Sequence, residues 1–120
     1  MKIILEGQPK STNNIYRYMC MGRSPRMYMS QEGKTIKESY KWQAKSQWSE
    51  KPIDTDWPLE VTISLYFNDK RKHDVDNFSK ICLDSLTGIV WVDDCQIQKL
   101  TVTKHYDKLK PRIEIEILKV

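Results

Sequence analysis

Residues 71–80, RKHDVDNFSK, place two carboxylates one residue apart behind a basic run. Asp74 and Asp76 are followed by Lys80, and on a helix the side chains of Asp76 and Lys80, four residues apart, can meet. Mg²⁺ takes oxygen ligands, often from carboxylates, and a lysine can offset charge on a phosphate. An ordinary helix start also fits, because aspartate satisfies free N–H groups at an N-cap and in a first turn. Spacing alone leaves both interpretations open.

A second acidic pair, Asp93 and Asp94, lies in the segment WVDDCQ at 91–96. A helix of about 14 residues between the two pairs would be roughly 21 Å long, so the chain must turn back to bring them together. If it does, three carboxylates can hold a divalent cation that activates water and steadies the leaving oxygen in phosphodiester cleavage. The other interpretation of this pair is a plain acidic turn.

The basic residues beside the first acidic pair are Lys70, Arg71 and Lys72. Cations in this position would hold the phosphates of a nucleic acid near the carboxylates. A solvated loop is the alternative, and it is the commoner role of a short basic run. The neighbouring His73 is expected to face phosphate or solvent rather than to bind a metal.

The elements that must position these residues follow from the hydrophobic pattern. Strict alternation over 59–67 predicts a strand, and an apolar stripe at helical spacing predicts helices over 30–49 and 75–88. Ser30 is the expected N-cap of the first helix and Gly88 the expected stop of the second. The remaining expectations are strands over 2–6, 96–105 (with a bulge between Ile97 and Leu100) and 113–117, and an irregular segment over 7–29. The order β-α-β-α-β-β predicts an α+β fold, with two main helices on a small mixed sheet.

Composition and charge limit the class of protein. The 120 residues are 39% hydrophobic and 30% charged, which is ordinary for one globular domain spanning 1–120. The net charge of +4 permits nucleic-acid binding without requiring it. The three cysteines form no CxxC pair, which is typical of a reducing compartment. The first apolar run is too short for a signal peptide or a membrane span. We therefore expect a soluble cytoplasmic protein.

The stretch HDVDNFSKICLDSLTGIVWVDDCQI, residues 73–97, resembles the signature of the RusA family of Holliday junction resolvases. In that family an Asp-x-Asp-Asn motif opens a helix, a lysine follows, and a hydrophobic-Asp-Asp-x-Gln segment closes the region. PKSTNNIYRY at 9–18 and SQEGKTIKESY at 30–40 are similar to further family segments in the same order. The segment LTGIVWVDD, residues 86–94, is the hinge between the second expected helix and the Asp93–Asp94 pair, and it is shorter than in the family pattern.

The resemblance implies a homodimeric, Mg²⁺-dependent endonuclease, with Mn²⁺ as a possible substitute, that acts on four-way DNA junctions. The family's acidic catalytic and metal positions fall on Asp74, Asp76 and Asp94, and its important lysine falls on Lys80. Asp93 is a possible further ligand. Paired nicks on symmetry-related strands suit a two-fold dimer, which holds two sites at a fixed separation.

The segment 16–29, rich in Arg, Tyr and Met, is then a candidate DNA-contacting loop. Arg17, Arg23 and Arg26 would meet phosphates, and tyrosines would stack on unpaired bases. A loop that packs at a dimer interface is the alternative. Two other functions also stay open: a non-catalytic binder of branched nucleic acid with the same fold, and a nuclease for other branched DNA such as flaps.

Overall fold

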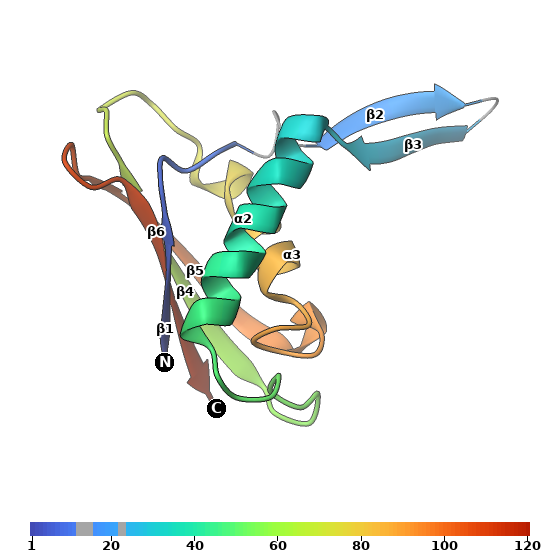
Figure 1. The fold of residues 1–120 in the computed structure, drawn as a ribbon, viewed down its shortest axis with the longest axis vertical. Helices are drawn as coiled ribbons and strands as arrows, with labels where there is room; N and C mark the ends of the chain where they lie inside the picture. Colours follow the sequence, from blue (N-terminus) through green and yellow to red (C-terminus); the bar gives the residue numbers. More distant parts are fainter. Residues whose placement is uncertain (12–15, 22–23) are drawn as a thin grey trace.

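The computed structural model describes the backbone of residues 1–11, 16–21 and 24–120, and the side chains of residues 1–11 and 29–120. Within these ranges the chain forms a four-stranded mixed sheet, two α-helices and a two-stranded hairpin (Figure 1). The strands of the main sheet, in their spatial order, are β1 (Lys2–Glu6), β6 (Arg112–Lys119), β4 (Leu59–Phe67) and β5 (Ile97–Tyr106). The helices are α2 (Gln31–Gln47) and α3 (Ser79–Leu86). The expected α+β fold and the order of its main elements are confirmed.

Strand β4 is the centre of the sheet. It pairs in parallel with β5 on one side and antiparallel with β6 on the other. Its alternate residues are buried, as the period of two predicts. The pairing with β5 slips by one residue, because Leu59 faces Ile97 while Glu60 faces Lys99. The expected bulge in β5 is therefore confirmed, and it falls at Gln98.

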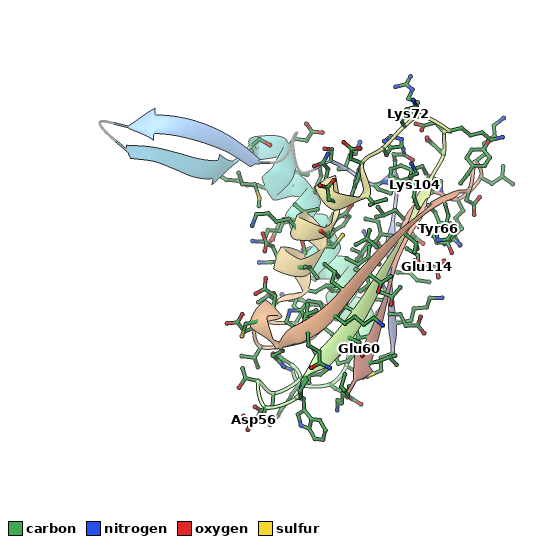
Figure 2. All side chains as sticks on the ribbon, turned by 180° about the vertical axis from the view of Figure 1, so that it is seen from behind. Asp56, Glu60, Tyr66, Lys72, Lys104 and Glu114 are labelled. Atoms are coloured by element: carbon green, nitrogen blue, oxygen red, sulfur yellow. The ribbon has the colours of Figure 1, made fainter. Side chains whose placement is uncertain are left out.

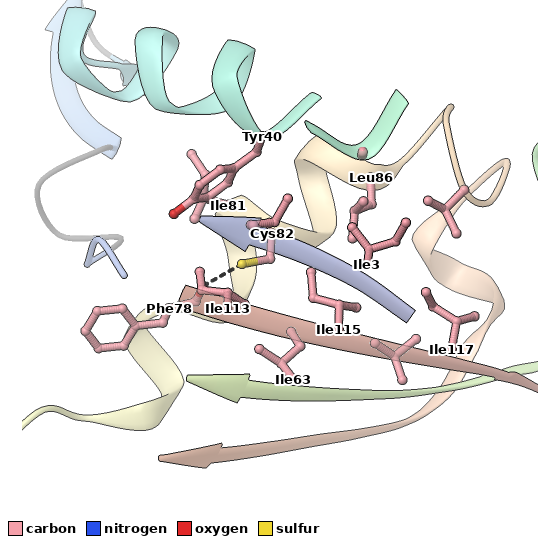
Figure 3. Close-up of a cluster of buried hydrophobic side chains, with 14 of the residues drawn as sticks. Ile3, Tyr40, Ile63, Phe78, Ile81, Cys82, Leu86, Ile113, Ile115 and Ile117 are labelled. Carbon is pink, nitrogen blue, oxygen red and sulfur yellow. Dashed lines mark hydrogen bonds between the residues drawn. The ribbon is translucent and has the colours of Figure 1, made fainter. Parts of the chain in front are cut away.

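Both helices cover one face of the sheet and leave the other face open (Figures 1 and 2). Tyr40 and Ala44 of α2 and Ile81, Cys82 and Leu86 of α3 are buried. They pack with isoleucines of β1, β4 and β6 in one hydrophobic core (Figure 3). Burial of each such aliphatic side chain contributes about 1.5–3 kcal/mol, so this core fixes the position of α3 on the sheet.

Two sequence expectations need correction. The second helix does not run unbroken from residue 75. A 3₁₀ turn, η1 (Val75–Asn77), precedes α3, and Phe78 lies between them with φ −119°. Phe78 is buried and packs edge-on against Phe67, so burial of its ring decides the local geometry. Gly88, with φ +89°, follows the helix as expected.

The segment 7–29 is not wholly irregular. Tyr16–Met21 (β2) and Ser24–Met29 (β3) pair antiparallel and project beyond the N-terminal end of α2 (Figure 1). Pro25 lies within β3, and both strands of a lone hairpin are edges, where proline is tolerated. Neither α2 nor α3, the helices of the described part of the chain, has the length and apolar character that a membrane crossing requires.

Candidate functional site

The first acidic pair lies in the connection between β4 and α3. Asp74 and Asp76 are exposed. Asp74 stands before η1 in extended backbone, but its side chain makes no capping hydrogen bond. Neither carboxylate forms a hydrogen bond or ion pair with a residue that the structure describes. The hydrogen bonding that the capping interpretation requires is therefore not present among these residues.

Aromatic packing holds this acidic pair in place from both sides. The ring of His73 stacks on Phe67, with centroids 4.0 Å apart and an interplanar angle of 5°. Its Nε2 also lies 2.9 Å from Oδ1 of Asp69. Phe78, on the other side of the pair, is buried in the core. Asp74 and Asp76 therefore sit on a short, anchored segment rather than on a free loop.

Lys80 lies in the first turn of α3 and forms an ion pair with Asp84, whose Oδ2 is 3.4 Å from the lysine Nζ. Both side chains are partly exposed, so this pair alone contributes only a few tenths of a kcal/mol. The pairing orients the Lys80 ammonium toward Asp84, which lies one turn further along α3. Sequence reasoning did not place Asp84 in the site, although it falls four residues after Lys80 on the same helical face.

The hinge after α3 is a tight turn locked by a buried tryptophan. Trp91 is fully buried, and its Nε1 donates to the Thr87 hydroxyl at 3.0 Å. The N–H of Gly88 donates to the carbonyl of Trp91 at 2.7 Å. The positive φ of Gly88 favours glycine at this position. These contacts fix the backbone that directly precedes Asp93 and Asp94.

Asp93 acts as an N-cap for a 3₁₀ turn, η2 (Asp94–Gln96). Its Oδ1 accepts from the N–H of Cys95 at 3.0 Å, while Oε1 of Gln96 accepts from the N–H of Asp93 at 2.9 Å. These bonds form a reciprocal capping box. The Cys95 N–H in particular holds the pKa of Asp93 below its ordinary value. Metal binding by Asp93 stays a prediction, beside this capping role.

Gln96 anchors the acidic turn to a distant segment. It is 6% exposed, and its Nε2 donates to the carbonyls of Ile53, Asp54 and Trp57 at 3.2, 2.6 and 3.3 Å. Sequence reasoning included this glutamine in the motif but missed its role. The only hint was an amide two residues after an acidic pair. Gln96 thus positions Asp94, two residues before it.

Asp94 lies in an excess of negative charge. Its pKa is raised, first by desolvation, then by the hydrogen bond and charge of Asp93 and by the charge of Asp84, while Lys80 opposes the shift. The charges of Asp84 and Lys80, on the helix that Asp74 and Asp76 precede, therefore reach Asp94, whereas Asp74 and Asp76 are not among the groups that shift its pKa. Among the described residues, no three His, Cys, Asp or Glu side chains form a group that could hold a metal ion.

Comparison with known proteins identifies the family. The model of the endodeoxyribonuclease RusA family matches residues 6–118. The chain belongs to the RusA endodeoxyribonuclease family. Among curated proteins, the crossover junction endodeoxyribonuclease RusA of Escherichia coli K12 is 28% identical over 110 residues, covering 91% of this chain and 87% of that protein. The proteins of that name from Shigella sonnei and from Enterobacteria phage 82 match with the same identity and coverage. The family expected from the motifs is confirmed.

The acidic side chains of this RusA family member suit a hard divalent cation. Carboxylate oxygens are the ligands that Mg²⁺ prefers, and it commonly binds through one or two of them together with waters and substrate phosphates. Asp74 and Asp76 are exposed and uncommitted among the described residues. Desolvation is the first cause of the raised pKa of Asp94, and a cation nearby would offset the negative charges of Asp93 and Asp84 that add to it. The chemistry of these oxygen donors suits magnesium, but the described residues do not gather three of them into one group.

The two segments that carry the candidate DNA-binding residues of this RusA family chain lie at one end of the molecule (Figure 1). Lys70, Arg71 and Lys72 are exposed in the loop after β4, at the same end of the molecule as the β2–β3 hairpin (Figures 1 and 2). Arg17 and Arg26 lie on the hairpin strands, but their side chains are outside the described residues, as is the whole of Arg23. DNA contact by these six residues stays a prediction.

Proposed function

We propose that this protein is a Mg²⁺-dependent endonuclease that resolves four-way DNA junctions by paired symmetric nicks. The observation that carries the proposal is the family match over 6–118, which contains all the candidate acids. Several curated relatives are named crossover junction endodeoxyribonucleases. The open carboxylates of Asp74 and Asp76, beside a basic loop, support the same chemistry.

In this proposal Asp74, Asp76 and Asp94 hold the cation, and Lys80 faces the reacting phosphate. Bound magnesium would supply Lewis acidity and lower the pKa of a bound water. Lys80 offsets negative charge on the phosphate, and its pairing with Asp84 holds it near Asp94. Asp93 and Gln96 act indirectly, because their capping box fixes the backbone that carries Asp94.

We further propose that residues 1–120 act as one nuclease domain within a homodimer. Two nicks at symmetry-related strands require two active sites, and a two-fold dimer supplies them at a fixed separation. The protein would act in the cytoplasm, where the DNA of bacteria and of their phages is processed. The curated relatives come from such sources.

The test is cleavage of an end-labelled mobile four-way junction with and without Mg²⁺. We expect symmetric nicks that require the cation and that disappear in Asp76→Asn, while junction binding survives. Binding without nicking in either Mg²⁺ or Mn²⁺ would show a non-catalytic binder and refute the proposal. A flap substrate cut as readily as the junction would refute junction selectivity and favour a broader branched-DNA nuclease.

A further inference from the structure

A hollow of about 290 Å³ lies between the loop after β4 and the C-terminal end of β5. The loop contributes Lys70, Arg71 and Lys72, and β5 contributes Lys104 and His105. Lys72 and Lys104 lie at the same end of the molecule in Figure 2. Among the residues that line this hollow, sequence reasoning assigned a DNA contact only to Lys70, Arg71 and Lys72.

The walls of this hollow are fixed by several contacts. Lys104 Nζ donates to the carbonyl of His73 at 3.2 Å and so ties the end of β5 to the loop. The ammonium of Lys70 lies 5.0 Å from the ring centroid of Tyr106. His105 stacks on Tyr66, with centroids 4.8 Å apart. A loop that is tied at these points presents its cations in a defined arrangement, unlike a solvated basic run.

The charge of the hollow is strongly positive. Lys70, Arg71, Lys72 and Lys104 face a single carboxylate, Asp69, which leaves an excess of three positive charges in the lining. That carboxylate is also committed locally, because Oδ1 of Asp69 lies 2.9 Å from Nε2 of His73 and accepts from the N–H of Arg71 at 3.1 Å. The unbalanced cations therefore remain available to an anion.

We propose that this hollow is a phosphodiester-binding subsite for one arm of the DNA substrate, with Lys104 as its principal strand-borne contact and His105 beside it. A concave site lined by one sign of charge focuses its field on the opposite charge, and DNA backbone phosphate is a polyanion of the right sign. The inference rests on the proposed function, since it supposes that the substrate is DNA.

The hollow lies next to the acidic pair Asp74 and Asp76 along the chain, which suits it to position a substrate phosphate. The loop that forms one wall continues directly into Asp74, and the bond from Lys104 holds the residue before this aspartate. A phosphate seated in the hollow is therefore held at a defined place relative to the acidic pair. The contact reads no base, so it serves linear and branched DNA alike.

The test is DNA binding without any divalent cation, which separates it from the cleavage reaction. Fluorescence anisotropy in EDTA gives Kd for a labelled linear duplex and a labelled four-way junction over a range of KCl concentrations. Losing one phosphate contact reduces the slope of log K against log salt by about 0.9. If the variant and the wild type bind equally at 1 M KCl, this change in slope makes the variant bind roughly eightfold more weakly at 0.1 M KCl. We expect this loss in Lys104→Ala with both DNAs, and a smaller loss in His105→Ala.

Lys99→Ala is the matched control, because Lys99 is an exposed lysine near the other end of the same strand. Lys104→Gln is the second variant, since it keeps a side-chain donor for the His73 carbonyl and removes only the charge. It should lose affinity as Lys104→Ala does. If Lys104→Gln binds like the wild type, or if Lys99→Ala changes the slope equally, the subsite is refuted. Far-UV circular dichroism and thermal melts confirm that each variant is folded.

Discussion

The four hydrogen bonds of the Gln96 side chain allow a sharp test of how the acidic turn is built. Leucine has similar volume but no polar atoms, so Gln96→Leu removes all four bonds. The two shortest are the donation to the Asp54 carbonyl at 2.6 Å and the acceptance from the Asp93 N–H at 2.9 Å. The Ile53 and Asp54 carbonyls each keep another donor, the N–H groups of Val92 and Trp57, both at 3.1 Å. Among the described residues, the Asp93 N–H and the Trp57 carbonyl therefore lose their hydrogen-bond partner.

The expected cost follows from these two groups. Each buried polar group left without a partner costs about 1–3 kcal/mol, and water can reach part of this turn because Asp54 and Asp93 are exposed. We therefore expect Gln96→Leu to lower the free energy of unfolding by about 2–4 kcal/mol. At roughly 4 °C per kcal/mol for a domain of this size, the melting temperature falls by about 8–16 °C.

Urea denaturation at neutral pH measures this loss, and Gln98→Leu is the control. Gln98 is exposed at the bulge, only two residues away. Gln96→Glu adds a second comparison, because a carboxylate facing carbonyl oxygens is least favourable when ionised, so its deficit should shrink at acidic pH. A free energy of unfolding for Gln96→Leu within about 0.5 kcal/mol of the Gln98→Leu value would refute the anchoring role.

Three further predictions concern charge and the sheet edge. Asp94→Asn should raise the melting temperature of the metal-free protein at neutral pH while it abolishes nicking. The reason is that a raised pKa means that ionised Asp94 is disfavoured in the fold. An unchanged or lower melting temperature contradicts this. The pKa of Glu114 is lowered, first by Lys2 and also by Arg112, so its stabilisation is present above an unfolded pKa near 4.5 and is lost as the pH falls through the lower folded value. Urea titrations between about pH 6 and pH 3 should then show a larger loss for the wild type than for Glu114→Gln, and equal losses would contradict it. The Gln47 side chain accepts from the N–H of Ile4 and donates to its carbonyl, both at 2.7 Å, and so covers the edge of β1. Gln47→Ala should therefore accelerate amide hydrogen exchange at Ile4. Unchanged exchange would contradict the covering of this edge.

The sequence was sufficient where local pattern determines structure. The alternation of β4 and the helical stripe of α2 predicted both elements, because burial on one face requires those periods. Ser30 was recognisable as an N-cap from its chemistry, and its hydroxyl accepts from the N–H of Gly33 at 3.0 Å. The acidic candidates were found in the same way, from residue type and order.

Long-range contacts account for what could not be predicted. The carbonyls that Gln96 binds lie 39 to 43 residues earlier in the chain, and no local pattern indicates them. Lys104 lies beside the basic loop because β5 runs parallel to β4, so that the C-terminal ends of the two strands are neighbours. The break at Phe78 has the same origin, since its ring packs against β4. Helical periodicity does not record such contacts.

The measurement that tests the central claim most directly uses a supercoiled plasmid that extrudes a cruciform. Paired nicks across one junction convert the circle directly to a linear molecule, whereas single nicks give relaxed circles. We predict linear product with Mg²⁺, none in EDTA, and none from Asp74→Asn, Asp76→Asn or Asp94→Asn proteins that still bind the junction. Relaxed circles alone would contradict coordinated action by two sites. An intact plasmid in the presence of Mg²⁺ and bound wild-type protein would contradict the assignment of junction cleavage.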